Sequence, residues 1–398
     1  MRHLRIASTL TAAVAAAGFL AAGPATAAVT TASASGLATA GYTGVSGAGA
    51  SWPSLMISQW AQDERARGLV VNFNPDGDAA GRDGFIQDQF DFAASSPPFR
   101  SGNDKLGDTG REVVPWTYSY IPVTAGGTAF LYHLTVSGHA YTSLHLTGRT
   151  LMEIFTGQIT NWDNPQITQE TGQKLPNLAI TVVTHSEGSG DSWFLSRYLA
   201  TEYTKQWNAF CERVHPGLKL PCGPTESYPP FSGTVAEDGD SNVAALVSYR
   251  NGAIGYAAYG YALATQLPVV AMGNAAGKYV KPTPANVTTA LTRALINDDP
   301  KSQNYLQQDL TPVYTNPAPT SYPLSGYSYL IVPRTGKPPA IFSQAAGRTL
   351  STYLNYALCA GQKQSSLLGY APLPTPLVKG ALQQVQHIPG HIASSSCS

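Results

Sequence analysis

The sequence predicts an α/β protein with a parallel or mixed sheet, divided over two domains or two lobes. Short runs rich in β-branched and aromatic residues alternate with segments of helical spacing, which is typical of such a sheet. Glycine-rich turns separate several of these strands from the helices that follow. Because a single core becomes inefficient at 398 residues, we expect two domains or one chain that crosses between two lobes.

Each expected element rests on a local pattern. In the first helix, Leu55, Ile57, Trp60 and Ala61 recur with helical spacing, and small-residue loops at 47–53 and 77–81 precede two of the helices. The elements expected in chain order are a helix at 55–67, a strand at 70–73, a helix near 82–89, strands at 90–96 and 129–132, a helix at 149–155, a strand at 180–183 and a helix at 193–206.

The turn between the last strand and the last helix is a candidate ligand site. Residues 185–192 read His-Ser-Glu-Gly-Ser-Gly-Asp-Ser. A glycine-flanked turn from strand into helix presents free backbone N–H groups at the positive end of the helix dipole, so it can bind an anion. Open α/β sheets place ligands at such strand ends. Ser and Asp are also the ordinary N-cap residues, so the turn alone does not decide between the two roles.

The charge composition excludes a general polyanion binder. Only 12% of residues are charged, and 24 basic residues balance 24 acidic ones, so no net field favours nucleic acid or an anionic membrane. The hydrophobic share of 43% is enough for a normal core, which argues against disorder.

The N-terminus predicts export. Residues 1–27 have a basic start, an Ala-rich apolar run and the small-x-small pattern of Ala25-Thr26-Ala27, so we expect a signal peptide cleaved after Ala27 and a flexible linker at 28–41. No cysteine lies directly after the cleavage site, and no later segment has 18 uninterrupted apolar residues. We therefore expect a secreted protein without a membrane anchor.

The four cysteines predict disulfides. Three pairings are possible, and the short loop between Cys211 and Cys222 favours that pair, which leaves Cys359 to pair with Cys397. No CxxC pair and no cysteine-histidine cluster with zinc spacing is present, so we expect neither a metal nor a cofactor.

Six motifs occur in the order of a known family. They are Gly47-Ala48-Gly49-Ala50-Ser51-Trp52-Pro53, Asp91-Phe92-Ala93-Ala94-Ser95, Pro122-Val123-Thr124-Ala125-Gly126-Gly127, Ile154-Phe155-Thr156-Gly157-Gln158-Ile159-Thr160-Asn161-Trp162, Gly188-Ser189-Gly190 and Gly252-Ala253-Ile254-Gly255-Tyr256. Over about 44–389 the chain resembles the PstS-like phosphate-binding solute receptors of ABC transporters, especially secreted actinobacterial members, which share the motifs at 322–327 and 368–374.

This resemblance implies a type II two-lobed periplasmic-binding-protein fold, with mixed sheets flanked by helices and a ligand cleft between the lobes. Lobe 1 is expected at 42–127 plus 257–398 and lobe 2 at 128–256. The implied function is binding of phosphate or another small polar solute, without chemistry. An ABC transporter permease is a possible partner, and nucleic acid is not expected as one.

The family's ligand residues carry over only in part. Ser51 and Trp52 match a Thr-Phe pair, and Gly188-Ser189-Gly190 is retained. In the same motif His185 stands in place of an arginine and Asp191 in place of a threonine. Elsewhere Asp78 replaces a serine, and Ser96 replaces the aspartate that accepts the proton of phosphate. The expected ligand-binding set is Ser51, Trp52, Asp78, Ser96, His185, Glu187, Ser189, Gly190 and Asp191.

These replacements make the site more acidic, and three interpretations remain open. Two charges about 4 Å apart interact by roughly 4 kcal/mol at an effective dielectric constant near 20, so an added carboxylate opposes phosphate unless it is neutralised. In the first interpretation Asp78 and Asp191 only cap their helices. In the second, one of them takes over the proton-accepting role, while Arg82 or a protonated His185 supplies the lost cation.

In the third interpretation Asp78, Glu187, Asp191 and His185 form the acid/base set of an extracellular hydrolase acting on a glycoside or ester. A non-binding structural or scaffold role is a further alternative.

Two other features of the sequence also have structural explanations. We expect the acidic stretch 237–240 to be a solvated turn facing the cleft, since it lacks the full spacing of a calcium loop. Trp52 and Trp193 are expected either to pack in the core or to stack on an organic ligand.

Overall fold

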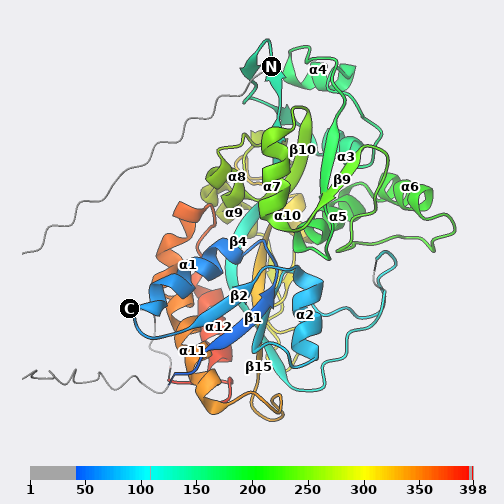
Figure 1. The fold of residues 1–398 in the computed structure, drawn as a ribbon. Helices are drawn as coiled ribbons and strands as arrows, with labels where there is room; N and C mark the ends of the chain where they lie inside the picture. The colour runs from blue at the N-terminus through cyan, green and yellow to red at the C-terminus, as the bar shows by residue number, and fades with distance from the viewer. Residues whose placement is uncertain (1–41, 108, 394–396, 398) are drawn as a thin grey trace, which may run out of the picture. The chain divides into compact units, whose positions relative to one another are not determined.

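The computed structural model describes residues 42–107, 109–393 and 397, and the predicted signal peptide and linker lie outside them. Within the described residues a mixed sheet of eight strands has the order β2-β1-β3-β15-β4-β10-β8-β9 (Figure 1). Its strands are β1 Val45–Gly49, β2 Val71–Asn74, β3 Phe92–Ser95, β4 Tyr118–His133, β8 Thr181–His185, β9 Thr234–Glu237, β10 Ala253–Ala258 and β15 Ser325–Pro333.

The sheet is parallel toward both edges and antiparallel at its centre. β1 pairs in parallel with β2 and β3, and β8 pairs in parallel with β9 and β10. β15 is antiparallel to β3 and β4, and β10 is antiparallel to β4. The 16-residue strand β4 pairs with β15 over 118–127 and with β10 over 128–133. One strand therefore belongs to both parts of the sheet.

Short strands form small separate sheets. They are β5 Thr135–Val136 with β6 His139–Ala140, β7 His145–Leu146 with β11 Ala271–Gly273 and β12 Tyr279–Val280, and β13 Leu295–Ile296 with β14 Gln308–Asp309.

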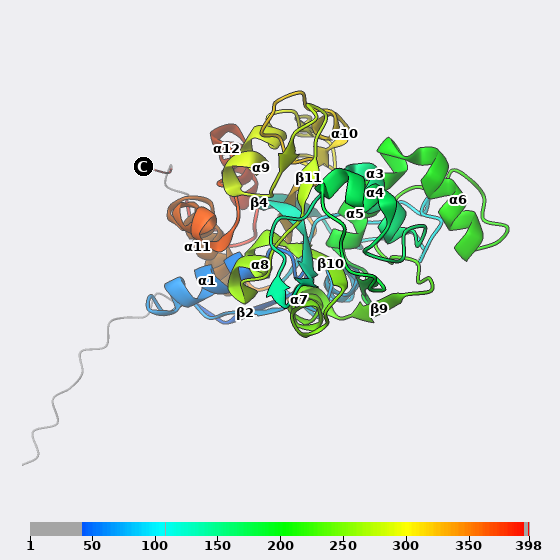
Figure 2. The same cartoon turned by 90° about the horizontal axis from the view of Figure 1, so that it is seen from above.

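Helices cover the sheet, as Figures 1 and 2 show. α11 packs against α1 and α12 near β1 and β4, and α7 packs against β10, β8 and β4. Among the described residues, no helix is long and apolar enough to cross a membrane. The helices are α1 Ser54–Arg65, α2 Asp78–Ile86, α3 Gly148–Phe155, α4 Pro165–Thr171, α5 Gly190–Glu202, α6 Thr204–Val214, α7 Gly239–Tyr249, α8 Tyr259–Thr265, α9 Pro284–Leu291, α10 Thr311–Tyr314, α11 Gln344–Leu358, the 3₁₀ helix η1 Ala360–Leu368 and α12 Thr375–Val385.

Most predicted elements are confirmed, with two errors at helix boundaries. The helix expected near 82–89 begins at Asp78, because Gly81 is not a turn residue but lies inside α2, where an added Cβ would be 2.4 Å from the Cα of Gly49. This glycine permits close packing of helix and strand. The single helix expected at 193–206 begins at Gly190 and divides at Tyr203 into α5 and α6.

Both expected disulfides are present, Cys211–Cys222 and Cys359–Cys397. They close segments whose ends are 11 and 38 residues apart. Cross-links of this kind stabilise the fold mainly by restricting the unfolded chain.

Candidate ligand site

Helix N-termini gather at the carboxyl ends of the sheet's parallel strands. α1 follows β1, α2 follows β2, α5 follows β8 and α7 follows β9. Parallel strands end at the same edge of a sheet, so the loops that follow them meet there. Most of the predicted site residues lie in these loops or in the first turns of these helices, and they come from positions far apart in the sequence.

The Asp78 carboxyl group lies at the start of α5. Its Oδ1 accepts a hydrogen bond of 2.7 Å from the Ser96 N–H, and its Oδ2 accepts one of 2.7 Å from the Gly190 N–H. Burial raises the pKa of Asp78 to about 7, although the two N–H groups and nearby Arg82 oppose the shift. The interpretation in which Asp78 caps its own helix does not describe its contacts, because its side chain makes no cap hydrogen bond in α2 and instead accepts one from the N–H of Gly190, the first residue of α5.

The start of α5 is built for this contact. Ser189 is the N-cap, and its Oγ accepts hydrogen bonds from the N–H groups of Asp191 and Ser192. At Gly190 an added Cβ would lie 2.8 Å from Asp78 Oδ1 and 2.9 Å from the Cβ of Ser96. Only glycine lets an acceptor approach the Gly190 N–H so closely.

His185 and Glu187 form a buried ion pair. His185 Nδ1 lies 2.7 Å from Glu187 Oε1, and His185 Nε2 lies 3.0 Å from the Tyr256 carbonyl oxygen, which can only accept. Burial opposes the charged imidazolium, but Glu187, Asp191 and Asp240 together raise the pKa of His185 to about 10. The same contact with His185 lowers the pKa of Glu187 despite its burial. His185 is therefore an imidazolium at neutral pH.

Asp240 is a site residue that sequence reasoning missed. Its Oδ1 accepts a hydrogen bond of 2.7 Å from Ser51 Oγ, and its Oδ2 accepts one of 2.7 Å from the Ala258 N–H. The expectation of a solvated turn at 237–240 is wrong for this residue, which is fully buried because α7 begins beside Ser51. The sequence does carry a signal, since Gly-Asp-Ser before an apolar helix is the same pattern as at 190–192.

Asp191 lies beside Asp240 and is incompletely paired. Its Oδ1 accepts a hydrogen bond of 3.1 Å from Thr128 Oγ1, which in turn accepts one of 3.2 Å from Trp52 Nε1. Its Oδ2 is buried without a hydrogen-bond partner. Burial and the neighbouring Asp240 raise the pKa of Asp191 well above its ordinary value.

Arg82 is fully engaged with carboxylates other than the predicted ones. Its Nε lies 3.0 Å from Glu112 Oε2 and its Nη2 lies 2.7 Å from Glu226 Oε1. Its Nη1 donates a hydrogen bond of 2.8 Å to Ser95 Oγ. Two carboxylates thus neutralise Arg82, so the positive charge within the predicted set is that of His185.

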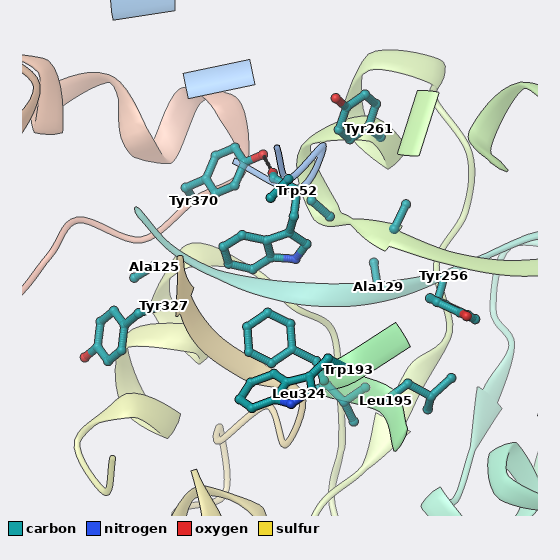
Figure 3. Close-up of a cluster of buried hydrophobic side chains, with 14 of the residues drawn as sticks. Trp52, Ala125, Ala129, Trp193, Leu195, Tyr256, Tyr261, Leu324, Tyr327 and Tyr370 are labelled. Carbon is teal, nitrogen blue, oxygen red and sulfur yellow. Dashed lines mark hydrogen bonds between the residues drawn. The ribbon is translucent and has the colours of Figure 1, made fainter. Parts of the chain in front are cut away.

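Trp52 belongs to the core. It is 1% exposed and its ring packs against Phe194 and Tyr370, at centroid distances of 5.5 and 5.7 Å. Figure 3 shows the Tyr370 hydroxyl directed at the Trp52 backbone, where it donates to the carbonyl oxygen. Trp193 lies in the same cluster (Figure 3) and is covered by the Arg197 guanidinium, 5.0 Å from its ring. Core packing, the first of the two expected roles, describes both residues.

The profile of a family described as "PBP superfamily domain" matches residues 25–360, which is most of the chain. The chain belongs to the PBP superfamily. Its relatives include the "Phosphate-binding protein PstS" of Methanocaldococcus jannaschii, 27% identical over 349 residues, with 85% of each chain covered. The protein of the same name from Xylella fastidiosa (strain Temecula1) is 28% identical over 338 residues, covering 84% of this chain and 83% of the relative.

A solved structure supports the superfamily fold. The "Phosphate-Binding Protein from Stenotrophomonas maltophilia" superposes with a TM-score of 0.62 at 18% identity, over 88% of this chain and 97% of that one. The fold expected from the resemblance is therefore confirmed. In this PBP superfamily member, Asp78, Ser96 and Gly190 contact one another, His185 contacts Glu187, and Ser51 and Asp191 lie with Asp240.

Proposed function

We propose that this protein is a solute receptor that binds inorganic phosphate at the start of α5, where the Asp78 carboxylate now lies. The observation that carries the proposal is the pair of N–H groups, from Ser96 and Gly190, that converge on the two oxygens of one carboxylate. Donors that hold two carboxylate oxygens also suit two oxygens of a phosphate. The description of the relatives as phosphate-binding proteins supports the same ligand.

Phosphate and Asp78 would compete for these donors. An ionised Asp78 beside a bound phosphate costs about 4 kcal/mol per pair of unit charges at 4 Å, so the side chain must turn away or take up a proton. Because its pKa is about 7, Asp78 takes up a proton near neutral pH. This residue would then act on the ligand in two ways, as a competitor when ionised and as a proton-bearing neighbour when neutral.

The two-lobed arrangement gives the site a means of opening. We place lobe 1 at 42–127 plus 257–398 and lobe 2 at 128–256. The two boundaries fall side by side, because Thr128 of β4 pairs with Ala258 of β10. The contacts Asp78–Gly190, Ser51–Asp240 and Arg82–Glu226 each join residues assigned to different lobes, so the structure would correspond to a closed state.

The proposed location is outside the cytoplasm, after cleavage of the signal peptide behind Ala27. The two disulfides support an oxidising compartment. An ABC transporter permease is the proposed partner, by analogy with the receptor family. None of the relatives named above is described as a hydrolase, so the hydrolase alternative is left without support.

Calorimetric titration with phosphate tests the proposal, using wild-type protein, Asp78→Ser and a control, Asp298→Ser, at pH 6 and pH 8. Asp298 is an exposed carboxylate. We expect wild-type affinity to rise from pH 8 to pH 6, because protonation removes the competing carboxylate. Asp78→Ser should bind at least about tenfold more tightly at pH 8 and should lose the pH dependence that Asp78 causes.

The protonation of phosphate itself changes with pH in the same way for all three proteins. Differences in affinity and pH dependence among the proteins therefore report on Asp78. Asp298→Ser should match the wild type at both pH values. If neither wild type nor Asp78→Ser releases or absorbs heat with phosphate at either pH, phosphate is not the ligand. If both bind with the same affinity and pH dependence, Asp78 does not lie in the ligand's position.

A further inference from the structure

We infer that a cavity at the start of β4 binds a small organic dicarboxylate, for which succinate is the probe. The cavity has a volume of about 280 Å³ and lies where the first residues of β4, the residue after β15, α12 and the segment 300–305 meet. All of its lining residues belong to the segments that we assign to lobe 1. This inference goes beyond the proposed function and does not depend on phosphate.

The cavity is separate from the proposed phosphate site. Tyr118 and Ser119 line it at the first residues of β4, whereas Thr128, ten positions beyond Tyr118, contacts Asp191. At about 3.3 Å per residue, ten residues of strand span roughly 33 Å. A small ligand in the cavity therefore does not touch the residues at the start of α5.

The charged side chains that line the cavity are positive. They are Lys301 and Arg334, and within the described part of the chain neither forms an ion pair with a carboxylate. The Arg334 guanidinium donates a hydrogen bond of 3.3 Å from Nη1 to Gln384 Oε1, which leaves most of its N–H groups for a ligand. Burial and the neighbouring Arg334 and His391 lower the pKa of His387, as expected beside a guanidinium that no carboxylate neutralises.

A buried amide provides independent evidence for a missing acceptor. Gln384 is 6% exposed, and its Oε1 accepts hydrogen bonds from Ser119 Oγ at 3.0 Å and from Arg334. Because a guanidinium can only donate, this contact identifies the oxygen of the amide and so fixes the position of its NH₂ group. Among the described residues this NH₂ group has no hydrogen-bond partner, whereas buried polar groups normally have one. Gln384 lines the cavity, so an acceptor bound there would supply the partner.

A hydroxyl group adds a further donor. Ser302 Oγ, in the lining segment 300–305, accepts hydrogen bonds from Asn297 Nδ2 at 3.0 Å and from the Asn304 N–H at 3.1 Å. Since both acceptor positions of this oxygen are used, its proton remains free to be donated. The cavity thus combines guanidinium, ammonium, amide and hydroxyl donors, and no carboxylate is present among its described lining residues. Such a set of donors suits an oxyanion.

The charge and the size of the cavity select the class of anion. Two positive side chains are balanced by two negative charges, and the planar guanidinium matches a carboxylate in particular. A volume of about 280 Å³ corresponds to roughly nine water molecules of 30 Å³ each, which is more than one inorganic oxyanion needs. Because the two cations come from separate segments, we expect one carboxylate at Arg334 and Gln384 and the other at Lys301.

The test is calorimetric titration of the full chain with succinate, at pH 7 and low ionic strength in a buffer without phosphate or carboxylates. We expect one succinate per chain with a Kd of about 1 mM or less, and acetate should bind at least about tenfold more weakly. Arg334→Gln should weaken succinate binding at least about tenfold, and Arg334→Lys should weaken it less because the charge remains. The control Arg293→Gln removes an exposed arginine outside the cavity and should bind as the wild type does.

Gln384→Glu separates loss of the ligand from loss of folding. Glutamate keeps an oxygen for Ser119 and Arg334 but replaces the NH₂ group with a second, negatively charged oxygen, which repels a carboxylate ligand. Because this glutamate can pair with Arg334, the variant should unfold at the same temperature as the ligand-free wild type or at a higher one. It should bind succinate at least about tenfold more weakly, and saturating succinate should raise the unfolding temperature of the wild type only.

Several results would overturn the inference. One is a wild-type protein that does not bind succinate, and another is succinate binding that Arg334→Gln and Gln384→Glu leave unchanged. Acetate binding as tight as that of succinate would contradict a dicarboxylate ligand, and phosphate binding that Arg334→Gln abolishes would assign an inorganic anion to the cavity instead. The comparison of wild type with Asp78→Ser concerns the other site, so its failure does not bear on this cavity, and a failed succinate titration does not bear on the proposed function.

Discussion

Two buried charge clusters in this protein are balanced differently. The first joins Arg82 and Arg100 to Glu112 and Glu226, so two guanidinium groups face two carboxylates. In the second, the imidazolium of His185 faces three carboxyl groups, those of Glu187, Asp191 and Asp240. Here one oxygen of Asp191 has no hydrogen-bond partner. We refer to them as the arginine cluster and the histidine cluster.

The arginine cluster has the features of a structural ion-pair network, whereas the histidine cluster has features that are typical of a binding site. Guanidinium forks satisfy carboxylates with paired, directional hydrogen bonds, so the arginine cluster is complete without a ligand. The histidine cluster keeps an excess of acid in a dry environment, which costs stability unless something else binds there. Perturbed and unsatisfied groups of this kind are typical of binding sites. Three predictions test the contrast.

The largest effect is expected from Arg82→Met, which removes the central cation of the arginine cluster. Because Glu112 and Glu226 would be left buried without it, we expect the free energy of unfolding to fall by about 3–5 kcal/mol. Urea unfolding measures this. Arg149→Met is the control, since the Arg149 side chain is exposed and its i,i+4 ion pair with Glu153 is worth about 0.5 kcal/mol. A loss in Arg82→Met no larger than in the control would contradict the structural role of the cluster.

A smaller effect is expected from pH, acting on the histidine cluster. The folded pKa of His185 is raised to about 10, above its ordinary value of 6.5. Its contribution to stability is therefore complete below about pH 6.5 and is lost as pH rises toward 10. Urea unfolding of the wild type should show a loss on the order of 2 kcal/mol between pH 7 and pH 9.

His185→Gln should flatten that part of the profile, because glutamine does not titrate. The raised pKa of Asp78 acts in a different window, since its contribution is lost between about pH 4 and pH 7. An equally steep fall above pH 7 in His185→Gln would show that other groups cause it.

The smallest effect compares two adjacent serines, Ser95, which is bonded to the arginine cluster, and Ser96, which lies beside Asp78 and Gly190. Ser95 Oγ accepts a hydrogen bond from Arg82 and donates one to the Pro97 carbonyl, whereas Ser96 Oγ is buried without a partner. We expect Ser95→Ala to lower the free energy of unfolding by about 1–2 kcal/mol. Ser96→Ala should change it by less than about 0.5 kcal/mol or raise it. Equal losses at the two positions would show that the hydrogen bonds of Ser95 with Arg82 and Pro97 add nothing to stability.

Much of the fold could be predicted from the sequence because it depends on local patterns. The helix at 55–67, the strand at 70–73 and the disulfide pairing follow from hydrophobic spacing and loop length, and the structure confirms them. Gly81 was misjudged for a long-range reason. Its role is set by contact with Gly49, which a local pattern cannot show.

The sequence indicated residues that the structure brings together, but it did not indicate which of them contact each other. The turn at 185–192 indicated Gly190 and Asp191 as candidate site residues, but which carboxylate meets which N–H depends on tertiary packing. Asp78 therefore reaches another helix, and Asp240 is buried by Ser51 from a distant loop. Arg82 was indicated as a free cation because Glu112 and Glu226 are 30 and 144 residues away in the sequence.

The long strand β4 has a consequence for how the protein comes apart. Nine of its first ten residues pair with β15, with an irregularity at Val123, and its last six pair with β10, with no loop between the two segments. Because no loop separates the two segments, neither part of the sheet can lose its segment of β4 without disturbing the strand that the other part pairs with. We expect the described part of the chain to melt as one cooperative unit, with a single calorimetric transition rather than one for each lobe.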